Sequence, residues 1–67
     1  MILTSQIAKD KEAIINKGLD YYNPAEQIAD IEFFVKRKRM SVEEGEYLKN
    51  KIEQQILERD QVILKNK

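Results

Sequence analysis

Two helix-start signals, one at Asn23 and one at Ser41, constrain this chain more than any other feature of its sequence. Asn23 can cap a helix, the proline after it fits the first helical position, and Glu26 lies three residues beyond the cap. Ser41 is followed by Glu44 at the same spacing, which is the capping-box pattern. Residues 23–52 are therefore predicted to form a helix, a tight turn and a second helix.

Apolar residues follow helical spacing on both sides of this turn. The stripe before the turn consists of Ala25, Ile28, Ile31, Phe34 and Val35, widened by Phe33, and the stripe after it consists of Leu48, Ile52, Ile56 and Ile63. We predict helices over residues 24–38 and 42–64, antiparallel because their connection is short. At 1.5 Å per residue the second is about 33 Å long and the first covers only about 20 Å of it.

A third helix is predicted over residues 4–17, with Leu3, Ile7, Ile14 and Ile15 on one face, Lys11 interrupting it, and Gly18 as the stop. The prediction is an all-α fold of one domain, residues 1–67. In it the N-terminal helix packs beside the C-terminal half of the long helix. Residues 18–23 are long enough for this helix to pack within its own chain or to exchange with a neighbour.

Composition excludes several classes of protein. The 67 residues include neither Cys nor His, which removes disulfides and the usual zinc ligands and fits a reducing, cytoplasmic compartment. Lys and Arg total 12, as do Asp and Glu, so no global field steers the chain to nucleic acid. We expect no secretory signal and no membrane span. Oligomerisation remains as the usual way to stabilise so small a core.

The basic run (Lys36, Arg37, Lys38 and Arg39) has two interpretations. The favoured one is structural, because cations stabilise a helix C-terminus and the carboxylates of Glu43, Glu44 and Glu46 could neutralise them across the turn. The alternative is a small nucleic-acid-binding regulator whose basic run contacts the phosphates of duplex DNA.

The sequence contains few residues that could act as a catalytic nucleophile. Thr4, Ser5 and Ser41 are the hydroxyl residues other than tyrosines, and all three are predicted at cap positions. The glutamates after the turn fit a first helical turn better than a metal site. We expect no enzymatic activity, cofactor, metal or small-molecule substrate.

Two aromatic pairs, Tyr21–Tyr22 and Phe33–Phe34, are predicted to place one member inward and one near the surface, because neighbouring residues cannot share a helix face. Core packing is the favoured role, and a partner-binding hot spot is the alternative. Leu19, just before the first pair, is also expected to pack inward.

Residues 23–52 resemble the short C-terminal domain (SHOCT) family. The matching residues are Asn23, Pro24, Glu26, Gln27, Ile28, Ile31, Phe34, Met40, Ser41, Glu43, Glu44, Lys49 and Ile52. Lys38 departs from the family's turn glycine, and Gly45 departs from its aromatic position, for which Tyr47 is a nearby substitute. The resemblance implies a non-catalytic helical hairpin that oligomerises or docks to another protein.

The predicted function is a protein-interaction or oligomerisation module, a homodimer that uses the apolar surface around Ile56, Leu57, Ile63 and Leu64. The reason is that the end of the long helix is apolar over a wider arc than one neighbour can bury. Besides the nucleic-acid alternative, an inhibitor or adaptor of a larger host protein fits, since the size and composition resemble small phage and bacterial mobile-element proteins.

Overall fold

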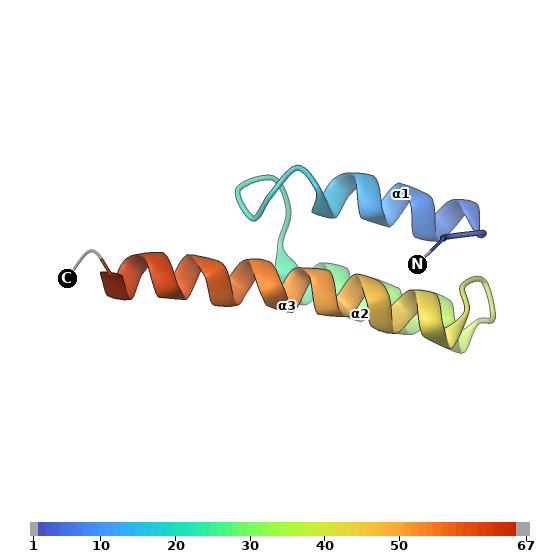
Figure 1. Ribbon diagram of the computed structural model, residues 1–67. Coiled ribbons are helices and arrows are strands. Elements are labelled where there is room, and N and C mark those ends of the chain that lie inside the picture. The colour runs from blue at the N-terminus through green and yellow to red at the C-terminus, as the bar shows by residue number, and fades with distance from the viewer. Residues whose placement is uncertain (1, 66–67) are drawn as a thin grey trace.

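The computed structural model describes residues 2–65, with side chains described as far as residue 60. It contains three helices, α1 (Gln6–Ile15), α2 (Pro24–Lys36) and α3 (Val42–Lys65), and no strand within the described residues (Figure 1). The molecule measures 44 × 21 × 18 Å. The all-α, three-helix prediction is confirmed. Within this part of the chain, none of the helices combines the length and apolar composition needed to cross a membrane.

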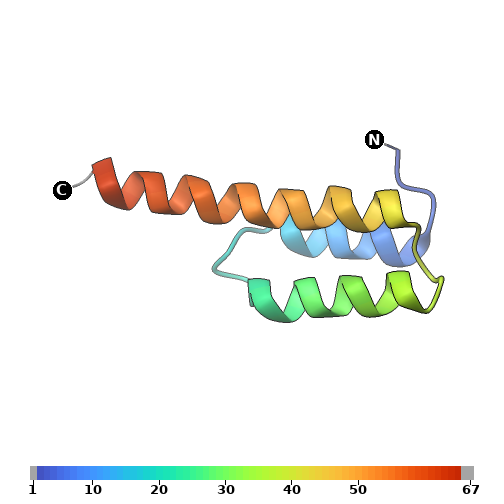
Figure 2. The same ribbon diagram turned by 90° about the horizontal axis from the view of Figure 1, so that it is seen from below.

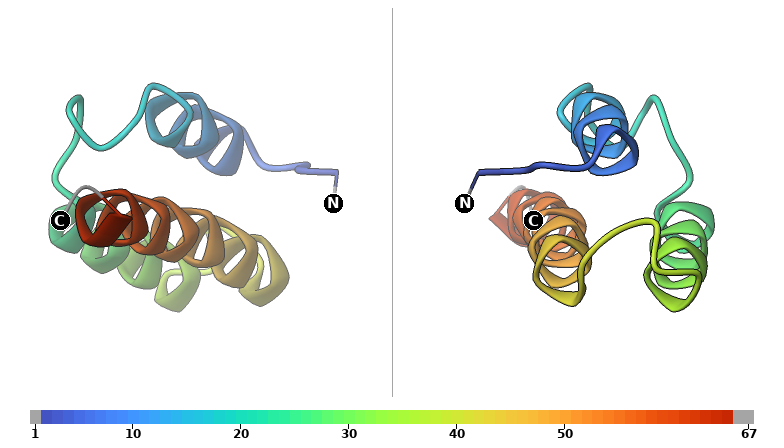
Figure 3. Two further views of the ribbon diagram at one scale, coloured as in Figure 1. Left: turned by 60° about the vertical axis from the view of Figure 1, so that its left-hand side comes forward. Right: turned by 90° about the vertical axis from the view of Figure 1, so that its right-hand side faces the viewer.

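The helices pack as a triangular bundle, seen end-on in Figure 3. The α2 and α3 helices run antiparallel, as predicted. The α1 helix packs against the N-terminal part of α3, far from the C-terminal end of that helix (Figure 2). Lys11, which interrupts the apolar face of α1, is half-buried between α1 and α2. Its ammonium donates to Gln27 at 2.9 Å and pairs with Asp30 at 3.2 Å, so the interruption connects two helices.

All three helices contribute to the core. Its buried apolar members are Leu3, Ala8, Ile15, Ile31, Met40, Leu48 and Ile52, with Ile7, Tyr22, Ile28, Phe34, Val35, Tyr47 and Ile56 packed around them. Met40 is only 4% exposed, as an apolar residue before a helix cap should be. Ala25 departs from its predicted stripe and is exposed, because it lies about 120° around the helix from the buried Ile31.

The α1 helix is shorter at both ends than the predicted residues 4–17. Ser5 is its N-cap and accepts a hydrogen bond from the amide of Ala8 at 3.3 Å. At the other end Asn16 is the C-cap, and Gly18 adopts a φ of 103° that stops the helix.

The α2 helix ends at Lys36 rather than Lys38, because Lys38 has a left-handed φ of 60°. The amide of Lys38 bonds to the Val35 carbonyl, and that of Arg39 bonds to the Phe34 carbonyl. This is the Schellman arrangement, in which the left-handed position normally carries glycine.

The predicted position of α1 is wrong. Rather than covering the C-terminal half of α3, α1 lies along its first half. Thr4 and Ser5 are hydrogen-bonded to Glu44 at the start of α3, and the Ile15 carbonyl accepts from Gln55 at 2.8 Å. The carboxylate of Glu44 accepts from the amides of the two residues that immediately precede α1, and these charge-assisted bonds hold the start of α1 beside the start of α3.

Candidate functional site

The residues predicted to form a self-association surface lie where α3 leaves the bundle. Ile56 is partly buried against the core, whereas Leu57 is 52% exposed. Ile63 and Leu64 belong to α3, but their side chains lie outside the described residues. The α3 helix has 24 residues against 13 in α2 and 10 in α1, so its C-terminal end continues past both neighbours (Figure 2).

The basic run occupies the last residue of α2 and the turn that follows it. All four side chains are exposed. The guanidinium carbon of Arg37 lies 5.1 Å from the centroid of the Phe33 ring, close enough for a cation–π interaction. Sequence reasoning missed this pairing, although the spacing of four residues on one helix could have indicated it.

Glu44 joins the starts of two helices. Its carboxylate accepts from the amide of Ser41 at 3.1 Å, while the Ser41 hydroxyl accepts from the amide of Glu44 at 3.0 Å. The same carboxylate accepts from the amides of Thr4, at 2.9 Å, and Ser5, at 3.1 Å. The side chain is buried, and the hydrogen bond from the Ser41 amide is the largest of the effects that lower the pKa of Glu44 to about 2. This glutamate is therefore a charged structural group.

The prediction that the glutamates after the turn neutralise the basic run is wrong, because none of them forms an ion pair with it in the part of the chain that the structure describes. Glu44 is used by backbone amides, and Glu43 and Glu46 are exposed. The ion pairs found among the described residues lie elsewhere and involve Lys11, Lys49 and Lys51. Among the described residues, the cations of the basic run therefore have no carboxylate within ion-pair distance. The described residues hold no cluster of carboxylates suited to a metal ion.

Ser5 and Ser41 act as helix caps, as predicted, whereas Thr4 precedes the cap and contributes its backbone amide. A second polar contact links α1 to α3 through the Tyr47 hydroxyl, which donates to Glu12 at 2.6 Å, and Lys51, which pairs with Glu12 at 3.6 Å. The hydrogen bond lowers the pKa of the Glu12 carboxyl and raises the pKa of the Tyr47 hydroxyl. These side chains hold α1 against α3.

Each aromatic pair is divided as predicted. Tyr22 and Phe34 pack on the core, while Tyr21 is 73% exposed and Phe33 is 51% exposed. The two phenylalanine rings meet edge-to-face with centroids 5.5 Å apart. The partly buried ring of Phe34 thus supports Phe33, about half of which is exposed to solvent. Leu19 is half-buried in the connector.

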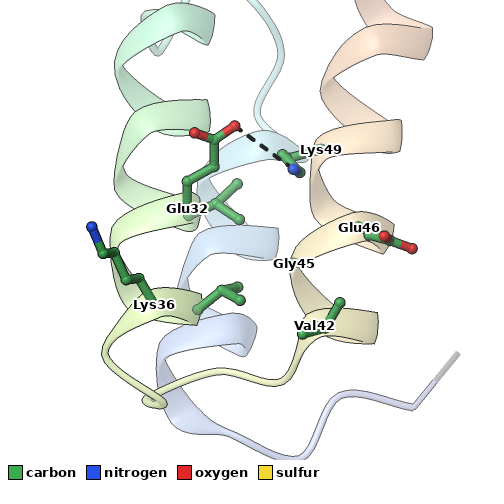
Figure 4. Close-up of a pocket in the computed structure, with 8 residues that line it drawn as sticks. Glu32, Lys36, Val42, Gly45, Glu46 and Lys49 are labelled. Carbon is green, nitrogen blue, oxygen red and sulfur yellow. Dashed lines mark ion pairs between the residues drawn. The ribbon is translucent and has the colours of Figure 1, made fainter.

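A shallow groove that sequence reasoning did not foresee lies between α2 and α3, on the face away from α1 (Figure 4). It has a volume of about 210 Å³, an apolar floor that includes Ile31 and Val35, and a rim bridged by the Lys49–Glu32 ion pair at 3.7 Å. Gly45 lines this groove and allows α2 and α3 to approach closely, since a Cβ atom on Gly45 would lie 2.5 Å from Val35 Cγ2. Val35 occupies the space that a side chain at position 45 would need. Helix packing therefore explains why this residue is a glycine.

Comparisons with protein-family models, curated proteins and solved structures gave no match to this chain. The resemblance of residues 23–52 to the short C-terminal domain family stays a prediction.

Proposed function

We propose that this protein is a non-enzymatic interaction module that forms a homodimer through the C-terminal end of α3. The observation that supports it is the difference in length between α3 and its two neighbours. From Leu57 to its end at Lys65 the helix measures about 13 Å, and the last described side chain on the core is that of Ile56.

The side chain of Leu57 is exposed, and three further apolar residues follow it near the end of the chain: Val62, Ile63 and Leu64. A helix with this much apolar character is stabilised when a partner removes it from water, at about 25 cal/mol for each Å² buried. The core of one chain is small and has no cysteine with which to form a disulfide. Dimerisation would therefore add buried area where the fold needs it.

A second copy is the partner that fits, because this end of α3 carries complementary charges in a short space. Glu58, Arg59 and Asp60 are exposed and adjacent. In an antiparallel pairing of two such ends, Arg59 of one copy would face Glu58 or Asp60 of the other. Such a contact is isologous, as in the commonest class of homodimer.

The substitution Leu57→Glu tests this proposal. A carboxylate at the centre of an apolar contact should weaken self-association by at least about tenfold. The matched control is Val42→Glu, since Val42 is 58% exposed at the other end of the same helix. Size-exclusion chromatography with light scattering should show the control behaving as the parent protein. Equal association of Leu57→Glu and the parent protein would contradict the proposal.

A further inference from the structure

The end of the bundle opposite to the proposed dimer contact carries a concentrated positive charge. The four side chains of the basic run are exposed, and the ion pairs formed by the described residues involve other cations. The protein has no net charge, so this is a local attraction that acts at contact range. A polyanion is the natural ligand of four adjacent uncompensated cations.

Two aromatic rings and a planar guanidinium group lie beside these charges. The Arg37 guanidinium lies over Phe33, and Phe33 rests edge-to-face on Phe34. These three side chains and Arg39 line one depression of about 450 Å³. Exposed aromatic rings and guanidinium planes are the side-chain surfaces on which unpaired nucleobases stack. The depression therefore combines a stacking surface with cations for the phosphates.

The backbone at Lys38 supports a role for the charge. Lys38 holds the left-handed position of the Schellman motif, where glycine would be free of strain. Residues kept in such a conformation at an energetic cost are found preferentially at functional sites. With a glycine here the basic run would lose one of its four cations.

We infer that the basic run and Phe33 together bind single-stranded nucleic acid, with a base stacked on the Phe33–Arg37 surface and phosphates on the surrounding cations. Bases in a duplex are already stacked on one another, so the aromatic surface favours a single strand. A membrane surface fits less well, because the depression offers one well-exposed ring beside two guanidinium groups rather than the continuous apolar face with which a helix inserts.

The direct test is fluorescence anisotropy of a labelled oligothymidine of about 15 nucleotides, titrated with the whole protein. Four phosphate contacts on a single strand give a slope of about −2.8 for log affinity against log salt, so affinity should fall about 50-fold between 50 and 200 mM salt. The double variant Arg37→Gln, Arg39→Gln should make the slope shallower by about 1.4. The matched control removes two exposed cations from the α1 region, Lys9→Gln and Lys17→Gln, and should leave the slope unchanged.

Two further variants separate stacking from charge. Phe33→Leu removes the ring and should weaken binding at least about fivefold at an unchanged salt slope. Arg37→Lys keeps the charge and loses the planar group, with the same expected pattern. Circular dichroism confirms that each variant is folded.

Several outcomes would overturn the inference. The first is that the anisotropy does not change at about 50 mM salt with up to about 100 μM protein. The second is that the Arg37, Arg39 double variant and the Lys9, Lys17 control lose the same amount of affinity. The third is that a duplex binds as tightly as the single strand. Binding to phosphatidylserine vesicles without binding to the oligonucleotide would also overturn it. The proposed dimer is tested at the other end of α3, so neither result decides the other.

Discussion

Glu44 accepts a hydrogen bond at 3.1 Å from the backbone amide of Ser5, which lies 39 residues earlier in the chain. The same carboxylate completes the capping box with Ser41 at the start of α3. One buried charge thereby satisfies amides at the N-termini of two helices and aligns α1 with the first half of α3. With α1 held there, Leu57 and the three residues after it on α3 are left exposed.

Replacing Glu44 should destabilise the protein more than any change at its exposed neighbours. In Glu44→Gln the amides of Thr4, Ser5 and Ser41 lose a charged acceptor, which should cost about 1.5–3 kcal/mol of unfolding free energy. The matched control Glu43→Gln alters an exposed carboxylate and should stay within about 0.5 kcal/mol. Urea unfolding followed by circular dichroism measures both, and equal effects would contradict the account of Glu44.

Stability should fall in acid because of the same carboxylate. The pKa of Glu44 is lowered from 4.5 to about 2 in the folded protein, so the unfolded chain binds more protons between these values. The stabilisation is thus present above pH 4.5 and is lost as the pH falls towards 2. The lowered pKa of Glu12 acts in the same direction. Urea midpoints measured across this range should fall steeply for the parent protein and less steeply for Glu44→Gln, and parallel curves would exclude Glu44 as the source.

Gly45→Ala should be destabilising although alanine is the better helix former. The added Cβ would lie 2.5 Å from Val35 Cγ2, and valine has little rotamer freedom with which to move away. We expect a loss of about 1–3 kcal/mol. In a Val35→Ala background the clash is absent, and Gly45→Ala should then be neutral or stabilising by up to about 1 kcal/mol. A double-mutant cycle from thermal unfolding measures the change of sign; additive effects would refute the close approach.

Lys38→Gly should stabilise the protein and weaken the inferred nucleic-acid binding. The φ of 60° suits glycine, so thermal unfolding should show a gain of about 0.5–1 kcal/mol. Arg39→Gly is the control, because Arg39 has no positive φ and gains nothing from glycine. A destabilised Lys38→Gly variant would contradict the left-handed turn.

Local patterns were sufficient to predict the helices of this fold. The caps at Asn23 and Ser41 and the stop at Gly18 each depend on neighbouring residues, so they can be recognised in the sequence. The end of α2 was predicted two residues too late, because a lysine is not a local stop signal. The resemblance to the short C-terminal domain family did align Lys38 with a turn glycine, and its φ of 60° is of the kind that glycine adopts.

Contacts between distant residues could not be predicted in this way. Glu44 has the pattern of an ordinary capping box, and its bonds to Thr4 and Ser5 depend on where α1 docks. The same holds for the groove beside Gly45, which requires the distance between two helices. The residues of the proposed dimer contact were chosen because the end of α3 is apolar over a wide arc of the helix, but their use depends on a second chain.

Sedimentation equilibrium of the unmodified protein tests the central claim most directly. Over a concentration series reaching high micromolar, the account predicts an average mass that rises from the 7.9 kDa of the monomer towards twice that value. A mass that stays at 7.9 kDa through the whole series, with no partner present, would contradict self-association through α3.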